Sequence, residues 1–203
     1  MRWRIGWRKA LSCCFAFSSL FPTIVNAGGV PKQDRAWKRY YTPSFGYCVS
    51  YPSRWLKGDA FEGAGLFVKT GTSKFSRPLG AIDFGALGAP PDSPLADARL
   101  APVNLVEDWR THLAGLKKFE RAERMEILEQ REFKFLGHAA LFTKNRYYDP
   151  QERANWAEEI LFINRNGTLY RLELECRLDQ LSRFEPVFSQ LMNTFQFDCT
   201  AGR

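Results

Sequence analysis

Apolar and polar residues alternate along several stretches of this chain. In the stretch FGYCVSYPSRW, which begins at residue 45, the residues Tyr47, Val49 and Tyr51 share one side and small residues lie between them, which is the period-two pattern of a strand. Pro52 has no N–H for a sheet and holds the residue before it extended, so the strand should end there. Further short strands are predicted over 65–69, 80–87, 125–132 and 139–147.

The strand pattern is strongest in a hairpin around Asn166-Gly167. This pair favours a two-residue type I′ turn, in which both positions need positive φ. The turn sets a register with Leu161 opposite Leu172, and it makes one face of the hairpin apolar. The other face is mixed, which indicates partial cover; it consists of Ile160, Phe162, Arg171, Glu173 and Glu175.

Two helices are predicted. The first begins after Asn104, whose side chain can cap it while Glu107 stands three residues on. The second should begin at Ser182, which forms a capping box with Glu185 and has Pro186 in or near the first turn. Each helix has an apolar side that should lie on a sheet. These sides consist of Leu105, Trp109, Leu113 and Leu116 in the first helix and Phe184, Phe188, Leu191, Met192 and Phe195 in the second.

Residues 1–27 have the features of a cleaved export signal. A basic head precedes an apolar stretch over 10–25, and Val25-Asn26-Ala27 places small residues where a signal peptidase cleaves. The apolar stretch is shorter than the roughly 20 residues of a membrane-spanning helix, and Pro22 interrupts it. We therefore expect no stable membrane span after cleavage.

Removal of this signal changes the charge of the chain. The whole chain has 29 Lys and Arg against 22 Asp and Glu, and the signal contains four of the basic residues and none of the acidic ones. The remaining 25 basic and 22 acidic residues give a net charge of +3, so nothing in the balance predicts a nucleic-acid partner. After the signal, we predict a flexible lead-in over 28–42 and a single domain over 43–199.

Three cysteines follow the signal: Cys48, Cys176 and Cys199. In an oxidising compartment this odd number predicts either one disulfide and one free thiol or an intermolecular bridge. Cys199 is the expected partner in a disulfide, because a bond there would hold the C-terminal segment in place. The sequence leaves the pairing open.

Several motifs together resemble the PsbP-like superfamily, which includes an extrinsic photosystem II protein, a Ran-binding nuclear import factor and many exported bacterial proteins. The matching stretches are Phe45–Trp55, the Asn166-Gly167 hairpin with Leu169–Leu172, and the helix end Met192–Phe195, within a resemblance over about residues 43–198. The resemblance implies an α+β fold, an antiparallel β-sheet flanked by helices in an α-β-α sandwich. It implies a binding or accessory role and no reaction.

The residues themselves indicate no catalytic, cofactor-binding or metal site. His112 lies beside the apolar side of the first helix and His138 lies in a Gly-His turn, and neither has a partner at ligand spacing. Four acids lie at the open end of the hairpin, where we expect water to screen them, with an arginine such as Arg171 or Arg177 or a bound calcium ion as alternatives. These acids are Glu158, Glu159, Glu173 and Glu175.

A recognition surface is predicted in the segment 146–156, which joins two strands. It combines aromatic residues and arginine, the types that dominate binding hot spots. The candidate surface consists of Arg146, Tyr148, Arg153 and Trp156. The alternative is that Tyr147 and Trp156 end the flanking strands and pack on the sheet.

The sequence therefore predicts an exported, non-catalytic binding or accessory domain, bacterial and periplasmic or secreted, whose partner is an unknown protein or envelope component. The alternative is an enzyme, a hydrolase whose carboxylates and histidine meet only in the fold. A deep cleft that gathers Glu or Asp with His112 or His138 would favour the enzyme. A shallow surface with Tyr148 and Trp156 exposed would favour the binding domain.

Overall fold

The computed structural model describes residues 36–59, 66–69, 80–87 and 103–199. All of them belong to the compact unit Gln33–Arg203. The predicted export signal, residues 1–27, lies outside the described residues and stays a prediction.

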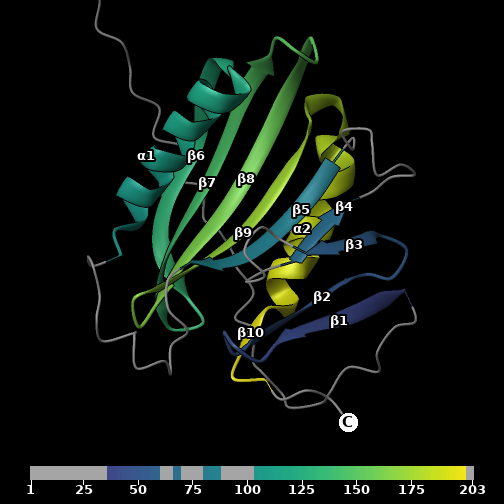
Figure 1. The fold of residues 1–203 in the computed structure, drawn as a ribbon, viewed down its shortest axis with the longest axis vertical. Helices are drawn as coiled ribbons and strands as arrows, with labels where there is room; N and C mark the ends of the chain where they lie inside the picture. Colours follow the sequence, from purple (N-terminus) through teal and green to yellow (C-terminus); the bar gives the residue numbers. More distant parts are fainter. Residues whose placement is uncertain (1–35, 60–65, 70–79, 88–102, 200–203) are drawn as a thin grey trace, which may run out of the picture. The chain divides into compact units, whose positions relative to one another are not determined.

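A seven-stranded antiparallel sheet forms the centre of the domain (Figure 1). Its strand order is β3-β4-β5-β9-β8-β7-β6, and each neighbouring pair runs antiparallel. The strands are β3 (Leu56–Asp59), β4 (Leu66–Lys69), β5 (Gly80–Leu87), β6 (Glu123–Phe135), β7 (His138–Asp149), β8 (Ala154–Arg165) and β9 (Thr168–Arg177). All the strands predicted over these stretches are present, and β6 and β7 are longer than expected.

The two helices lie on opposite faces of this sheet. α1 (Leu105–Gly115) continues into a π-helical turn, η3 (Leu116–Glu120), and packs on β7 and β8. α2 (Leu181–Thr194) follows a short 3₁₀ turn, η4 (Leu178–Gln180), and packs on β9 and β2 across the other face (Figure 1). The predicted α-β-α arrangement is confirmed.

Turn chemistry accounts for the two long hairpins. In the β8–β9 turn, Asn166 has φ 51° and Gly167 has φ 78°, as a type I′ turn requires. Leu161 lies opposite Leu172, so the predicted register is confirmed. The β6–β7 turn repeats this geometry at Leu136 and Gly137, where φ is 49° and 83°.

A second, three-stranded sheet contradicts part of the predicted lead-in. It consists of β1 (Trp37–Thr42), β2 (Tyr47–Pro52) and β10 (Gln196–Phe197), in the order β1-β2-β10. The prediction of a flexible segment over 28–42 is wrong for 37–42, because this polar stretch pairs with β2 and packs Trp37 and Tyr40 against the core. The end of β2 at Pro52 agrees with the prediction.

A disulfide closes this small sheet. It joins Cys48 of β2 to Cys199, which follows β10, with the two Cα atoms 6.2 Å apart. Cys176 is a buried free thiol, and its burial, with the charge of Glu159 next in effect, raises its pKa to about 12. The prediction of one disulfide that includes Cys199 and one free thiol is confirmed.

The start of α2 differs from the prediction. The helix begins at Leu181, with Gln180 in the N-cap position and no side-chain capping bond there in the described part of the chain. Ser182 therefore lies inside the helix, and Pro186 lies well past its first residue. The capping box is not needed because η4 leads directly into the helix, whose buried residues Phe184 and Phe188 stabilise it through tertiary packing.

Gly80 allows α2 to approach the sheet closely. A Cβ atom at Gly80 would lie 2.6 Å from Cε2 of Phe184, whereas a Cβ at Gly85 of the same strand would meet no described atom within 4 Å. We expect Gly80→Ala to lower the free energy of unfolding by about 2 kcal/mol through overpacking. Gly85→Ala is the matched control and should change it by less than about 1 kcal/mol. Urea unfolding measures both, and equal effects would contradict the role of Gly80.

Candidate functional site

The α1 helix covers only part of its face of the sheet. Asn104 caps the helix, since its Oδ1 accepts a hydrogen bond from the N–H of Glu107 at 3.2 Å, as predicted. Trp109 packs with Leu141 of β7 and Ile160 of β8. Because α1 lies on β7 and β8, the same face of β9 and β5 is left beside it.

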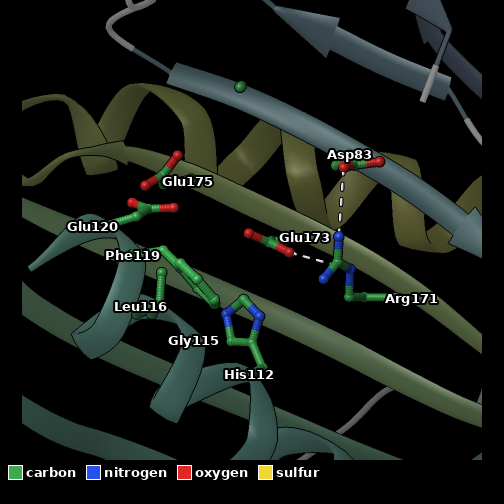
Figure 2. Close-up of a pocket in the computed structure, with 10 residues that line it drawn as sticks. Asp83, His112, Gly115, Leu116, Phe119, Glu120, Arg171, Glu173 and Glu175 are labelled. Atoms are coloured by element: carbon green, nitrogen blue, oxygen red, sulfur yellow. Dashed lines mark ion pairs between the residues drawn. The ribbon is translucent and has the colours of Figure 1, made fainter. Parts of the chain in front are cut away.

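Polar side chains occupy this half, which neither described helix covers. Residues two apart in a strand share a face, and the register places Asp83 of β5 opposite Glu173 of β9. A pocket of about 390 Å³ lies between these strands and α1 (Figure 2). Its lining residues include Asp83, His112, Glu120, Arg171, Glu173 and Glu175.

Arg171 lies between two of the pocket carboxylates. Its guanidinium is 3.5 Å from Asp83 and 3.2 Å from Glu173, as the dashed lines in Figure 2 show. Burial raises the pKa of Asp83 to about 6, although the charge of Arg171 opposes this shift. Burial also raises the pKa of Glu173, and the nearby charge of Glu158 adds to the effect. One arginine is therefore too little positive charge to keep these carboxylates in their ordinary range.

His112 contacts a fully buried carboxylate beneath the pocket. Its Nε2 is 2.8 Å from Oε1 of Glu158, and the side chain of Glu158 is 0% exposed. Asn145 donates a second hydrogen bond, from Nδ2 to Oε2 of Glu158 at 3.1 Å. Burial lowers the pKa of His112, but the hydrogen bond and charge of Glu158 outweigh burial, so the net shift is upward.

Glu175 has a different partner. The hydroxyl of Tyr147 donates a short hydrogen bond to its Oε1. Burial, then the charge of Glu175, raises the pKa of Tyr147, so this residue remains a neutral donor.

The prediction that the four hairpin acids form a solvated surface is wrong. Glu158 is 0% exposed and Glu159 is 2% exposed. Glu158 is covered by α1, and Glu159 lies on the opposite face, where Lys144 Nζ is 2.6 Å away. Of the two arginines considered as neutralising partners, Arg171 pairs with Glu173, whereas Arg177 pairs with Asp179.

Sequence reasoning missed the role of His112 because its partner is 46 residues away. The available signal was its position beside the apolar side of α1, which directs it toward the sheet. Asp83 and its ion pair with Arg171 were also missed, since no short-range motif joins them. His138 does not line this pocket. Its ring packs edge-on to Phe197, with the two ring centres 5.2 Å apart.

The fold is matched by a solved structure. The solution structure of cyanobacterial PsbP (CyanoP) from Synechocystis sp. PCC 6803 superposes with a TM-score of 0.55 at 15% sequence identity, over 84% of this chain and 98% of that chain. The domain has a PsbP-like fold. This agrees with the resemblance seen in the spaced hydrophobic residues, and at this identity it shows the fold alone.

Other comparisons add less. A Pseudomonas aeruginosa protein of unknown function, a putative regulator, is 16% identical over 82% of this chain and 97% of that chain, with a TM-score of 0.44. LpqN of Mycobacterium tuberculosis, which is involved in cell envelope biogenesis, is 11% identical over 81% of this chain and 86% of that chain, with a TM-score of 0.46. No family model matches the chain, and no curated protein matches it.

The PsbP-like domain does not bring the four predicted surface residues onto one surface. Trp156 is 2% exposed and packs with Leu116 and Tyr147, so its assignment to a surface is wrong and the packing alternative describes it. The other three stay predictions of a partner surface. Arg146 is exposed and donates from Nε to Glu126 at 2.8 Å, Tyr148 is half-buried under Arg124, and Arg153 is exposed.

The PsbP-like domain has no helix, within its described residues, that combines the length and hydropathy of a membrane crossing. Its Cys48–Cys199 disulfide fits an oxidising compartment.

Proposed function

We propose that this protein is an exported, non-catalytic binding domain whose pocket beside α1 takes a small cationic ligand. The observation that supports it is the charge of the pocket. Five carboxyl groups gather there or directly beneath it, against one arginine and one histidine; they are Asp83, Glu120, Glu158, Glu173 and Glu175.

A bound cation would relieve this imbalance. The pKa of Asp83 and that of Glu173 are both raised, chiefly by burial, so the folded domain opposes ionisation of both groups. A positive ligand would favour the ionised carboxylates, and by linkage the ionised carboxylates would favour the ligand. The pocket is thus suited to a cation and unsuited to an anion.

Export is supported by two independent features. Residues 1–27 have the pattern of a cleaved signal, and the Cys48–Cys199 disulfide suits a compartment outside the reducing cytosol. The predicted location is the bacterial periplasm or the medium, and the predicted partner remains a protein or envelope component that presents or delivers the cation.

Hexaamminecobalt(III) is a cationic probe for the pocket. Its ammine ligands do not exchange, so it binds through electrostatics and hydrogen bonds and not through coordination by side chains. The chain, expressed with its own signal and recovered from the periplasm of a bacterial host, is first checked by mass for cleavage after Ala27. In a titration followed by amide NMR, we expect shift changes centred on His112, Gly115 and Glu173. The double variant Asp83→Asn/Glu173→Gln should bind at least about tenfold more weakly, since two of the charges are removed.

The matched control removes two carboxylates from the exposed edge strand β6. Glu126→Gln/Glu129→Gln should bind like the wild-type chain, because both side chains are about half exposed and screened by solvent. The proposal would be overturned if the shift changes were spread evenly over the surface. It would also be overturned if both double variants lost the same affinity for hexaamminecobalt(III). Sulfate is the anionic probe, and its binding in the pocket would also contradict it.

A hydrolase is the second candidate, and one observation favours it. The pocket gathers Asp83 and Glu173 with His112, the arrangement named above as the mark of an enzyme. Yet both carboxylates contact the same arginine, and no serine, threonine or cysteine is among the described lining residues. The hydrolase would replace the binding domain as the favoured function if the protein turned over ester or phosphate-ester substrates and His112→Gln abolished that turnover.

A further inference from the structure

Three side chains at the base of the pocket converge from three elements. One ring nitrogen of His112 on α1 and one carboxylate oxygen each from Glu158 on β8 and Glu173 on β9 all lie within 4.8 Å of one another. The side chains of His112 and Glu173 are each 14% exposed, and that of Glu158 is 0% exposed. The group is therefore shielded from bulk water yet borders the pocket.

Two buried oxygen atoms at this position lack a hydrogen-bond donor. Asn145 Oδ1 has no partner among the described residues, although its Nδ2 holds Glu158. Glu173 Oε2 likewise accepts no hydrogen bond in the described part of the chain, since Arg171 Nε lies 3.2 Å away as an ion pair without hydrogen-bond alignment. Buried acceptors are almost always satisfied. One of these atoms belongs to the group and the other to a residue that contacts Glu158, so both residues border the position where a donor or cation would bind.

We infer that His112, Glu158 and Glu173 bind one divalent transition-metal ion of the Zn²⁺ class, which deepens and rests on the proposed cation-binding function. One imidazole nitrogen and two carboxylate oxygens suit Zn²⁺ or Co²⁺. Ca²⁺ prefers six to eight oxygen ligands, and Mg²⁺ retains most of its water. The donor set therefore selects a transition metal over both.

Metal binding requires the ligand atoms, which lie within 4.8 Å of one another, to adjust their spacing. Tetrahedral ligand atoms at about 2.1 Å from Zn²⁺ lie roughly 3.4 Å apart, whereas His112 Nε2 and Glu158 Oε1 are 2.8 Å apart. Binding would displace the proton from Nε2, to solvent if the ring is an imidazolium and to Nδ1 if the ring is neutral. Asn145 already orients Glu158, and Arg171 holds Glu173, as outer residues do around metal ligands.

Space for a fourth ligand exists on the pocket side. Gly115 lines the pocket, and a Cβ there would meet no described atom within 4 Å. A water molecule or a group from a partner could complete the coordination. Such an open position suits a protein that receives or delivers a metal ion.

Cobalt(II) substitution tests this inference on the untagged chain. We expect one equivalent of Co²⁺ to bind and to give the intense visible d–d absorption of four-coordinate cobalt, and Zn²⁺ should abolish that absorption by displacement. His112→Gln keeps a hydrogen-bond donor for Glu158 and should weaken Co²⁺ binding at least about tenfold. Glu173→Gln should do the same, with circular dichroism reporting that each variant is folded. His138→Gln, the other histidine, is the control and should bind like the wild-type chain.

The other possible outcomes contradict the metal site, and they differ in what they leave of the proposed cation-binding function. If hexaamminecobalt(III) binds in the pocket but Co²⁺ gives no d–d band, the cation-binding function stands and the metal site is wrong. If neither binds, both proposals fail. Co²⁺ binding that survives His112→Gln would place the metal elsewhere, and equal binding of millimolar Ca²⁺ at this position would contradict the transition-metal class.

Discussion

Replacement of Cys48 and Cys199 by alanine is expected to lower the free energy of unfolding by about 5 kcal/mol. The two residues are 151 positions apart, so their disulfide restricts nearly the whole unfolded chain. The chain-entropy model for a loop of that length gives this value. The bond also holds β10 against β2, where Phe197 packs edge-on to Tyr170 with ring centres 4.9 Å apart. The native state therefore loses a tertiary contact as well.

Urea unfolding with and without dithiothreitol measures this effect. Reductant should destabilise the wild-type chain to the level of the double variant and leave the double variant unchanged. The slope of free energy against urea should be larger without the disulfide, because the unfolded chain exposes more surface. Cys176→Ala, at the buried free thiol, is the control and should respond to reductant like the wild type. A wild-type chain indifferent to reductant would show that the disulfide contributes nothing.

Lys144→Met is expected to lower the free energy of unfolding by about 3 kcal/mol. Lys144 Nζ lies 2.6 Å from Glu159 and 2.7 Å from Glu185, and it links β7 and β8 to α2. Glu159 is 2% exposed. Removal of the lysine leaves this carboxylate buried without a counter-charge, which costs far more than the net stabilisation of the pair.

A second substitution separates this charge effect from lost packing. Glu159→Gln in the Lys144→Met background should restore about 2 kcal/mol, since it removes the uncompensated charge. Arg110→Met breaks an exposed pair with Glu107, whose two side chains are 67% and 66% exposed, and should cost less than about 0.5 kcal/mol. Urea unfolding of the wild type, the single variants Lys144→Met and Glu159→Gln and their double variant gives the coupling energy, and Arg110→Met is measured beside them. A Lys144→Met cost below that of Arg110→Met, with no rescue, would contradict the buried-pair interpretation.

Local chemistry explains which elements could be predicted. Asn166-Gly167 determines the β8–β9 turn because only a few residue types adopt positive φ at low cost, and a two-residue turn then determines every cross-strand pair. Asn104 determines the start of α1 in the same way, through a bond to a residue three positions on. The PsbP-like arrangement follows from such elements and from the spacing of apolar residues.

The failures have a common cause. The segment 28–42 is predicted to be a loose lead-in because it is polar and has glycine and proline near its start, yet residues 37–42 form β1, which pairing with β2 stabilises. The acids of the hairpin are predicted to be solvated because exposed charge pairs interact weakly, yet α1 covers Glu158. Trp156 belongs to the predicted recognition surface because its segment combines hot-spot residue types, yet it packs with Leu116 of η3, as the alternative prediction states. In each case pairing or packing with another element decided the outcome, and for Glu158 and Trp156 that element is distant along the chain.

The sequence by itself determined β2, β4, β5 and β6 to β9, the hairpin register, the first helix and the choice of Cys199 as a disulfide partner, since each depends on neighbouring residues or on a chain end. Only the tertiary structure determined the pocket. His112, Glu158 and Glu173 come from one helix and two strands, and they meet because α1 packs on β7 and β8, beside β9. The charge and desolvation of such a site depend on distances in space, which no spacing along the chain specifies.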